Sequence, residues 1–284
     1  MGKLVIHLGP PKTATTSFQR FFSTNKINGI IYHGVHQPRV TSDTSLCAEI
    51  YNFTTSIIRD DEQLKNRIER LSFDDNCIHL FSEEMFLVGS RGLTWVDKLK
   101  QLRPVLENVQ YEILIVIRNP EDAIRSLYQE IFFRVQDSGI NDINTFAKSV
   151  HSEIYMYDLF VDKLEELGFE NIKILDYMKL INNIYSLEEI FNVPVDIPLR
   201  LNLSNQSKRK NQTYYANNAD LRMILRSKML KCFGSILPSA LNRKIYNYLP
   251  RMKLNHVKPL DVNIESEVLK PFDYSYAEIL SKAI

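Results

Sequence analysis

The feature that most limits the fold of this chain is an alternation of short apolar runs with longer stretches of helical spacing. Most of the runs are continuously apolar, which is typical of strands covered on both faces of a sheet. Five strands are predicted: Leu4–Leu8, Gly29–His33, Cys77–Phe81, Glu112–Ile117 and Ile172–Leu175. This alternation predicts an α/β protein whose central sheet is mainly parallel.

The intervening stretches predict helices, and two of these have readable faces or ends. Phe18, Phe21 and Phe22 fall at helical spacing, so the first helix is expected to bury a phenylalanine stripe. Asn119 can cap the helix that begins at Pro120. The predicted helices are roughly 15–24, 44–58, 60–72, 94–103, 120–135, 143–167, 214–233, 239–249 and 263–282.

Composition is that of an ordinary globular protein. The chain has 284 residues, of which 44% are hydrophobic and 24% charged, enough for one core with an attached lobe. No stretch approaches the roughly 18 apolar residues of a membrane span, and the run 4–8 is too short for a signal-peptide core. We therefore expect a cytoplasmic protein or a catalytic domain whose anchor has been removed, and Met1 favours the first. The three cysteines form no C-x-x-C pair, so neither a disulfide framework nor a zinc cluster is indicated.

Charge is unevenly distributed along the chain. Residues 1–204 hold 21 Lys and Arg against 28 Asp and Glu, residues 205–258 hold 12 against 1, and residues 259–284 hold 2 against 5, so −7, +11 and −3 give the net +1. We expect an α/β core over 1–204 and a basic, mostly helical lobe over 205–284, packed on the same domain. Such a lobe suits an anionic partner or peripheral contact with a membrane, although solvated helix faces explain it equally well.

Residues 4–17 predict a strand, a tight turn and a helix start rich in hydroxyl groups. A helix N-terminus offers free N–H groups and the positive end of its dipole to a phosphate, and Lys12 adds a full charge. The loop is not a Walker motif, because Lys12 lies only three residues after Gly9 and no second glycine precedes it. No predicted strand ends in an Asp placed to hold magnesium, which disfavours a kinase.

A second segment, residues 112–126, predicts a strand that ends in Arg118 and is followed by a helix. Ligands of parallel α/β sheets bind at the carboxyl ends of strands, and the planar guanidinium group suits phosphate oxygens. Ser126 falls two turns into the helix.

Together these segments resemble the PAPS-dependent sulfotransferase family, whose donor is 3′-phosphoadenosine 5′-phosphosulfate (PAPS). Residues 11–16 are similar to the 5′-phosphosulfate loop, P-K-[TS]-G-[TS]-[TS], with Ala14 in place of glycine. Residues 118–126 are similar to the 3′-phosphate motif, R-[DN]-P-x-[DE]-x-x-x-S. Residues 128–130 and 167–177 look like the bacterial and carbohydrate sulfotransferase pattern, and the resemblance covers roughly residues 3–205.

The resemblance implies a P-loop-NTPase-like three-layer sandwich with a mainly parallel central sheet and a helical C-terminal lobe. It implies that PAPS and its product adenosine 3′,5′-bisphosphate bind without a required metal. The implied donor-binding residues are Pro11, Lys12, Thr13, Ala14, Thr15, Thr16, Ser17, Arg118, Ser126, Lys208 and Lys210. For the last two, a solvated charge run is an equal alternative.

The resemblance also assigns the chemistry. Lys12 would stabilise the leaving oxygen, and a carboxylate directly after the strand Cys77–Phe81 would be the general base, Glu84 in preference to Glu83. Histidine is the rival base, from His33 or His36; His7 and His79 lie inside predicted strands and are expected to be core residues. The candidate acceptor contacts are His33, His36, Arg91, Tyr128 and Arg134.

The sequence thus favours transfer of a sulfuryl group from PAPS to a hydroxyl of a carbohydrate, either a polysaccharide or a glycolipid. No nucleic acid partner is expected. Two alternatives stay open: a P-loop nucleotide kinase, and a non-catalytic nucleotide- or glycan-binding protein of the same fold.

Overall fold

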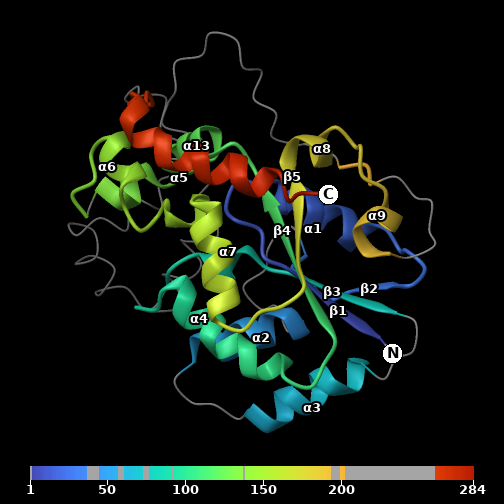
Figure 1. Ribbon diagram of the computed structural model, residues 1–284. Coiled ribbons are helices and arrows are strands. Elements are labelled where there is room, and N and C mark those ends of the chain that lie inside the picture. Colours follow the sequence, from blue (N-terminus) through green and yellow to red (C-terminus); the bar gives the residue numbers. More distant parts are fainter. Residues whose placement is uncertain are drawn as a thin grey trace, which may run out of the picture.

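The computed structural model describes residues 2–36, 45–56, 61–72, 77–90, 92–136, 138–192, 199–201 and 260–284. Its centre is a five-stranded sheet in the order β2-β3-β1-β4-β5, and every neighbouring pair is parallel (Figure 1). The strands are β1 (Lys3–His7), β2 (Ile30–Tyr32), β3 (Ile78–Ser82), β4 (Tyr111–Ile117) and β5 (Ile172–Asp176). The expected strands and the parallel α/β class are confirmed.

Helices occupy most of the connections between strands. In chain order they are α1 (Thr15–Thr24), α2 (Leu46–Thr55), α3 (Asp61–Ser72), η1 (Glu84–Leu87), α4 (Trp95–Leu102), η2 (Arg103–Leu106), α5 (Pro120–Gln136), α6 (Ile143–Ala147), η3 (Glu153–Tyr155), α7 (Tyr157–Glu166), α8 (Tyr177–Ile181), α9 (Leu187–Phe191) and α13 (Ser266–Leu280). The first helix has the predicted bounds, and Phe18 and Phe22 of its stripe are buried.

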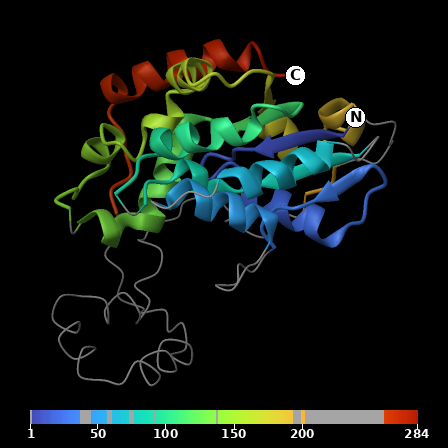
Figure 2. The same cartoon turned by 90° about the horizontal axis from the view of Figure 1, so that it is seen from below.

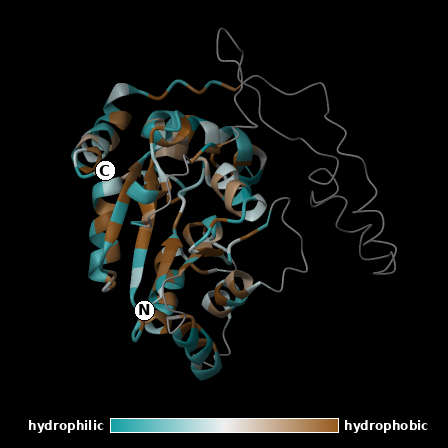
Figure 3. Ribbon diagram, turned by 90° about the vertical axis from the view of Figure 1, so that its right-hand side faces the viewer, coloured by the Kyte–Doolittle hydropathy of each residue, from teal (hydrophilic) through white to brown (hydrophobic). Residues whose placement is uncertain are grey.

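Side chains of successive strand residues enter two separate cores, which makes the protein three-layered. Leu4 and Ile6 of β1 pack with α2 to α5, α7 and α13, whereas Val5 packs with α1, α8 and α9 on the opposite face. Because both faces are covered, most strand residues are apolar, and the sheet in Figure 3 contains many brown segments.

The last described residues belong to the first of these cores. Helix α13 lies against α7 and α5 on the outside of that layer (Figure 2), and it buries Val268, Leu269 and Phe272. The helix predicted at 263–282 is therefore present. The helices predicted at 214–233 and 239–249 lie outside the described residues. Among the described residues, no helix has the length and apolar character needed to cross a membrane.

The single helix predicted over 143–167 is wrong, because this stretch is α6, η3 and α7. Helix α6 ends where the carbonyl of Phe146 accepts from the Ser149 N–H and, at 3.1 Å, from the Ser152 hydroxyl. Met156, between η3 and α7, has φ −81° and ψ 79°, which is not helical. Side-chain competition for a backbone carbonyl thus interrupts a stretch with continuous helical spacing.

Strand register brings the carboxyl ends of β1 and β3 level with each other, and β4 continues three residues further, to Ile117. His7 at the end of β1 is in register with Ser82 at the end of β3 and with Leu114 of β4. The segments that follow β1, β3 and β4 therefore leave the same edge of the sheet, where ligands of open parallel sheets bind.

Candidate functional site

The turn between β1 and α1 has a tightly constrained backbone. Thr13 closes it by donating both its N–H (3.3 Å) and its hydroxyl (2.7 Å) to the carbonyl of Pro10. Lys12 (φ 71°) and Ala14 (φ 66°) adopt left-handed conformations that usually favour glycine. A Cβ on Gly9 would lie 2.1 Å from Oγ1 of Thr15, so only glycine fits beneath the loop.

This turn ends in a group of donors suited to an anion. The N–H groups of Ser17 and Phe18 donate to the carbonyl of Ala14, both at 3.0 Å, so the amides of Thr15 and Thr16 precede the helical ladder. A left-handed residue followed by a helical one turns successive N–H groups toward one concave side. Oγ1 of Thr15 is buried and has no hydrogen-bond partner within the described residues. The arrangement fits a phosphate or sulfate group.

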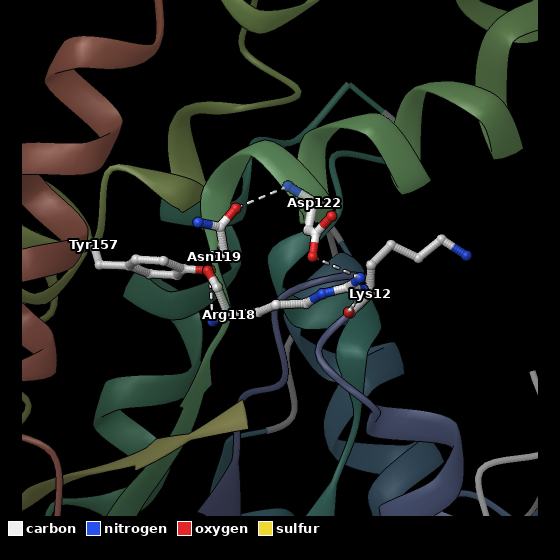
Figure 4. Close-up of polar contacts among 5 residues, drawn as sticks. All are labelled: Lys12, Arg118, Asn119, Asp122 and Tyr157. Carbon is white, nitrogen blue, oxygen red and sulfur yellow. Dashed lines mark hydrogen bonds and ion pairs between the residues drawn. The ribbon is translucent and has the colours of Figure 1, made fainter. Parts of the chain in front are cut away.

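Arg118 follows β4 and lies against this loop, as Figure 4 shows. Its Nη1 donates a 2.8 Å hydrogen bond to the main-chain carbonyl of Lys12, and its Nη2 lies 3.7 Å from Asp122. The guanidinium carbon is 4.7 Å from the centre of the Tyr177 ring. The residue is 7% exposed, and its buried Nε has no partner in the described part of the chain. The two sequence motifs therefore meet.

The start of α5 fixes the backbone next to Arg118. Oδ1 of Asn119 accepts the N–H of Asp122 at 3.1 Å, so the predicted helix cap is present (Figure 4). Ser126 lies about two turns into α5 and is half-buried.

The side chain of Lys12 forms an ion pair with Glu130, which also lies on α5. The Glu130 side chain is half-exposed, whereas that of Lys12 is mostly covered. The ammonium group of Lys12, which the sequence analysis expected to interact with the PAPS donor, is therefore paired with a carboxylate of the protein. Residues 128–130 contributed to the family resemblance, but nothing in the sequence indicated that Glu130 would reach the loop.

The two consecutive glutamates after β3 have different environments. Glu83 is 2% exposed, and its carboxylate accepts the N–H of Met85 at 2.8 Å. Glu84 is half-buried and begins η1. Lys98 of α4 is fully buried and donates to the carbonyls of Met85 (2.8 Å) and Val88, which fixes this turn. Its place was readable from the sequence, because Lys98 falls at helical spacing among apolar residues of 94–103.

Tyr155 contacts the loop from beneath. Its buried hydroxyl donates to the carbonyl of Pro11 at 2.8 Å. Burial raises the pKa of Tyr155 well above its ordinary range, with further contributions from Tyr157 and from the charges of Glu130 and Glu84.

The histidines near this edge differ in exposure. His7 is fully buried, with Nδ1 2.8 Å from the Ser82 hydroxyl, and burial lowers its pKa to about 3. His33 and the buried His79 form a ring pair with Nε2 and Nδ1 2.9 Å apart, and burial lowers the pKa of His33 to about 4. His36 is exposed. The expectation that His7 and His79 are core residues is confirmed, and roles for His33 and His36 stay predictions.

The remaining site predictions have separate outcomes. Tyr128 is 1% exposed and packs against Phe132 and Phe146, which gives it a structural role, and its contact with an acceptor stays a prediction. Arg91, Lys208 and Lys210 lie outside the described residues.

Comparisons with known proteins leave the family of this chain open. No protein-family model matches the chain, and no curated protein matches it significantly. Solved structures do show a likeness to sulfotransferases at low identity.

Three of these structures illustrate the likeness. A sulfotransferase from Alicyclobacillus acidocaldarius is 15% identical, with a TM-score of 0.41 over 84% of this chain and 95% of that one. The sulfotransferase domain from the curacin biosynthetic pathway is 11% identical, with a TM-score of 0.45 over 99% and 98%. Mouse sulfotransferase SULT7A1 complexed with PAP is 13% identical, with a TM-score of 0.32 over 87% and 82%. At these values the likeness alone assigns neither activity nor ligand.

Proposed function

We propose that this chain is a sulfotransferase that transfers a sulfuryl group from PAPS to a hydroxyl group. The observation that carries the proposal is the hydrogen bond from Arg118 to the carbonyl of Lys12, because it joins two motifs that lie 106 residues apart in the sequence. One motif provides the features of a 5′-phosphosulfate site and the other those of a 3′-phosphate site. A nucleotide that carries an anion at each end is the ligand that would use both.

The described residues fit such a donor. The amides of Thr15 and Thr16 and the buried hydroxyl of Thr15 would hold the phosphosulfate end. Arg118, whose buried Nε has no protein partner among the described residues, would hold the 3′-phosphate together with Ser126. This second anion is the group that distinguishes the proposed donor from ATP.

The transfer step needs charge stabilisation and one proton acceptor. The acceptor oxygen forms a bond to sulfur while the bond from sulfur to the bridging oxygen of the phosphosulfate breaks, and the electron pair stays on that oxygen. Lys12 would stabilise the charge that develops there, after exchanging its ion pair with Glu130. The proton of the acceptor hydroxyl would pass to Glu84, since Glu83 is buried and engaged with the N–H of Met85.

A carbohydrate hydroxyl is the acceptor that we propose, in a polysaccharide or a glycolipid. The support is a carboxylate base, which the resemblance associates with glycan-modifying relatives. The contact of His33 with His79 adds to this, because Nε2 of His33 lies 2.9 Å from Nδ1 of His79 and is engaged there.

The test is a transfer assay with PAPS as donor and a panel of hydroxylated acceptors that includes polysaccharides, glycolipids and simple phenols. We expect adenosine 3′,5′-bisphosphate to be released only with a carbohydrate acceptor. Lys12→Ala and Glu84→Gln should each lower kcat by about a hundredfold or more. Transfer to a phenol alone would reject the carbohydrate acceptor, and phosphoryl transfer from ATP·Mg²⁺ would establish the kinase alternative instead.

A further inference from the structure

Two buried tyrosines on one short segment each contact one of the two anion-binding motifs. Tyr155 ends η3 and Tyr157 begins α7, and both are 0% exposed. Their ring centroids are 6.3 Å apart and the rings are nearly perpendicular, at 83°. Neither residue belongs to the motifs that indicated a nucleotide site.

Tyr155 acts on the first motif. Its hydroxyl donates to the carbonyl of Pro11 at 2.8 Å, one residue before the left-handed Lys12. Burial raises the pKa of Tyr155 well above its ordinary range, so the hydroxyl keeps its proton and remains a donor. Removing this hydroxyl would take the Tyr155 donor away from the carbonyl of the half-buried Pro11, at the point where the loop turns.

Tyr157 acts on the second motif, as Figure 4 shows. Its hydroxyl accepts the N–H of Arg118 at 3.1 Å and donates to the carbonyl of Arg118 at 2.9 Å. Burial raises the pKa of Tyr157 as well. One side chain thus satisfies both backbone groups of the residue whose guanidinium contacts the loop.

The interruption at Met156 is what allows both tyrosines to act. Residues i and i+2 of a continuous helix point about 200° apart and do not face the same side. Because Met156 has ψ 79°, Tyr155 and Tyr157 both direct their hydroxyls toward the carboxyl edge of the sheet. The break in the predicted helix 143–167 therefore has a positional consequence at the site.

We propose that Tyr155 and Tyr157 are positioning residues that set the two anion pockets independently, Tyr155 for the 5′ end of the nucleotide and Tyr157 for the 3′-phosphate. This inference rests on the proposed function, because it assigns one end of a doubly phosphorylated adenosine to each residue. Neither tyrosine contacts the ligand in this scheme, and each acts through the backbone that it holds.

Calorimetry with three ligands separates the two roles. The 5′ gain is the affinity added by the 5′-phosphate, measured as Kd of adenosine 3′-phosphate divided by Kd of adenosine 3′,5′-bisphosphate. The 3′ gain is the affinity added by the 3′-phosphate, measured as Kd of adenosine 5′-phosphate divided by Kd of the bisphosphate. Tyr155→Phe should lower the 5′ gain about fivefold to tenfold and leave the 3′ gain within about twofold. Tyr157→Phe should do the reverse.

Tyr111→Phe is the matched control. Tyr111 is also buried, and its hydroxyl bridges two backbone groups, donating to the carbonyl of Gly168 (3.3 Å) and accepting the N–H of Glu170 (3.1 Å), but at the start of β4. A merely structural effect would lower the unfolding temperature in all three variants without separating the gains. We expect Tyr111→Phe to leave both gains unchanged.

Site-specific 3-fluorotyrosine provides a second measurement that keeps both hydroxyls in place. The ¹⁹F resonance at position 155 should shift more with adenosine 5′-phosphate, and the one at position 157 more with adenosine 3′-phosphate. If the two gains fall together, or do not change, in the two phenylalanine variants, the inference is overturned. The proposed function would still stand in that case, provided that the wild-type protein binds adenosine 3′,5′-bisphosphate. A wild-type protein that binds none of the three nucleotides would overturn both.

Discussion

Nη1 of Arg118 lies 2.8 Å from the main-chain carbonyl of Lys12, so the two residues that the sequence singled out for separate phosphate ends are in direct contact. The contact uses the backbone of Lys12, whose own ammonium group turns to Glu130. In the proposed donor site, Lys12 would therefore contribute its backbone to the 3′-phosphate side and its charge to the phosphosulfate side. The predictions below follow from this arrangement and from the residues that support it.

Replacing Glu130 with glutamine should strengthen binding of adenosine 3′,5′-bisphosphate. The carboxylate of Glu130 pairs with Lys12 and would compete with a bound nucleotide for it, so its removal would free the ammonium group for the ligand. We expect Kd to fall by about twofold to fivefold in calorimetry, because exchange of one partly exposed ion pair is worth up to about 1 kcal/mol. Glu121→Gln is the control, since Glu121 pairs with Arg125 on the same helix. Unchanged or weaker binding would show that the pair does not compete.

Ala14→Gly should stabilise the protein. Ala14 holds a left-handed conformation (φ 66°) that costs an L-residue about 1–2 kcal/mol, while glycine adds about 0.4–1 kcal/mol of unfolded-state entropy. The net expectation is a gain of about 0.5–1 kcal/mol in the free energy of unfolding, measured in urea. The same change at Ala123, buried in α5, should instead cost about 1 kcal/mol. A loss of stability at position 14 would mean that the loop relaxes the strain in another way.

Lys98→Met should destabilise the protein by about 2–4 kcal/mol. The buried ammonium group holds the carbonyls of Met85 and Val88, and methionine would fill the space but leave both acceptors without this donor. Lys100→Met, at an exposed position on the same helix, should change the free energy of unfolding by less than about 0.5 kcal/mol. Equal effects of the two substitutions would show that Lys98 does not hold the turn after Glu84.

Stability should decrease as the pH falls from 6.5, in part because of His7. The unfolded chain binds a proton at His7 near the ordinary pKa of 6.5, whereas burial delays protonation of the folded chain to about pH 3. The contribution of His7 to the free energy of unfolding is therefore fully present above pH 6.5 and is lost progressively as the pH falls toward 3. His7→Asn, which keeps a polar atom near the Ser82 hydroxyl, should make the slope between pH 6.5 and 4.5 shallower in urea titrations. If the slope does not change, the loss of stability at low pH comes from other titratable groups.

Much of the fold was predictable because strands covered on both faces are continuously apolar. Leu4 to Ile6 and Ile113 to Ile117 are nearly inaccessible to solvent, and this requirement is visible in the sequence itself. The cap at Asn119 was predictable because it is local: it joins Asn119 to Asp122, three positions further along the chain. The helix over 143–167 was not, because its interruption depends on the Ser152 hydroxyl reaching the carbonyl of Phe146.

The residues of the candidate site also differ in whether a local sequence pattern marks them. Lys12 and Arg118 were identified because each lies in a local pattern next to a strand end. Tyr155, Tyr157 and Glu130 were not, because their contacts join segments that are distant in the sequence and no local pattern marks them. The sequence showed that Ala14 replaces the glycine of the family pattern, but it did not predict that Ala14 would keep a left-handed conformation (φ 66°).

The central claim is that one nucleotide with an anion at each end bridges Lys12 and Arg118. Calorimetry with adenosine 3′,5′-bisphosphate and with ATP·Mg²⁺ tests it most directly, on the wild type and on Arg118→Lys, which keeps the charge but loses the planar fork. We predict that the bisphosphate binds at least about tenfold more tightly than ATP·Mg²⁺ and that Arg118→Lys removes most of this preference. Equal or tighter binding of ATP·Mg²⁺ by the wild type would contradict the account.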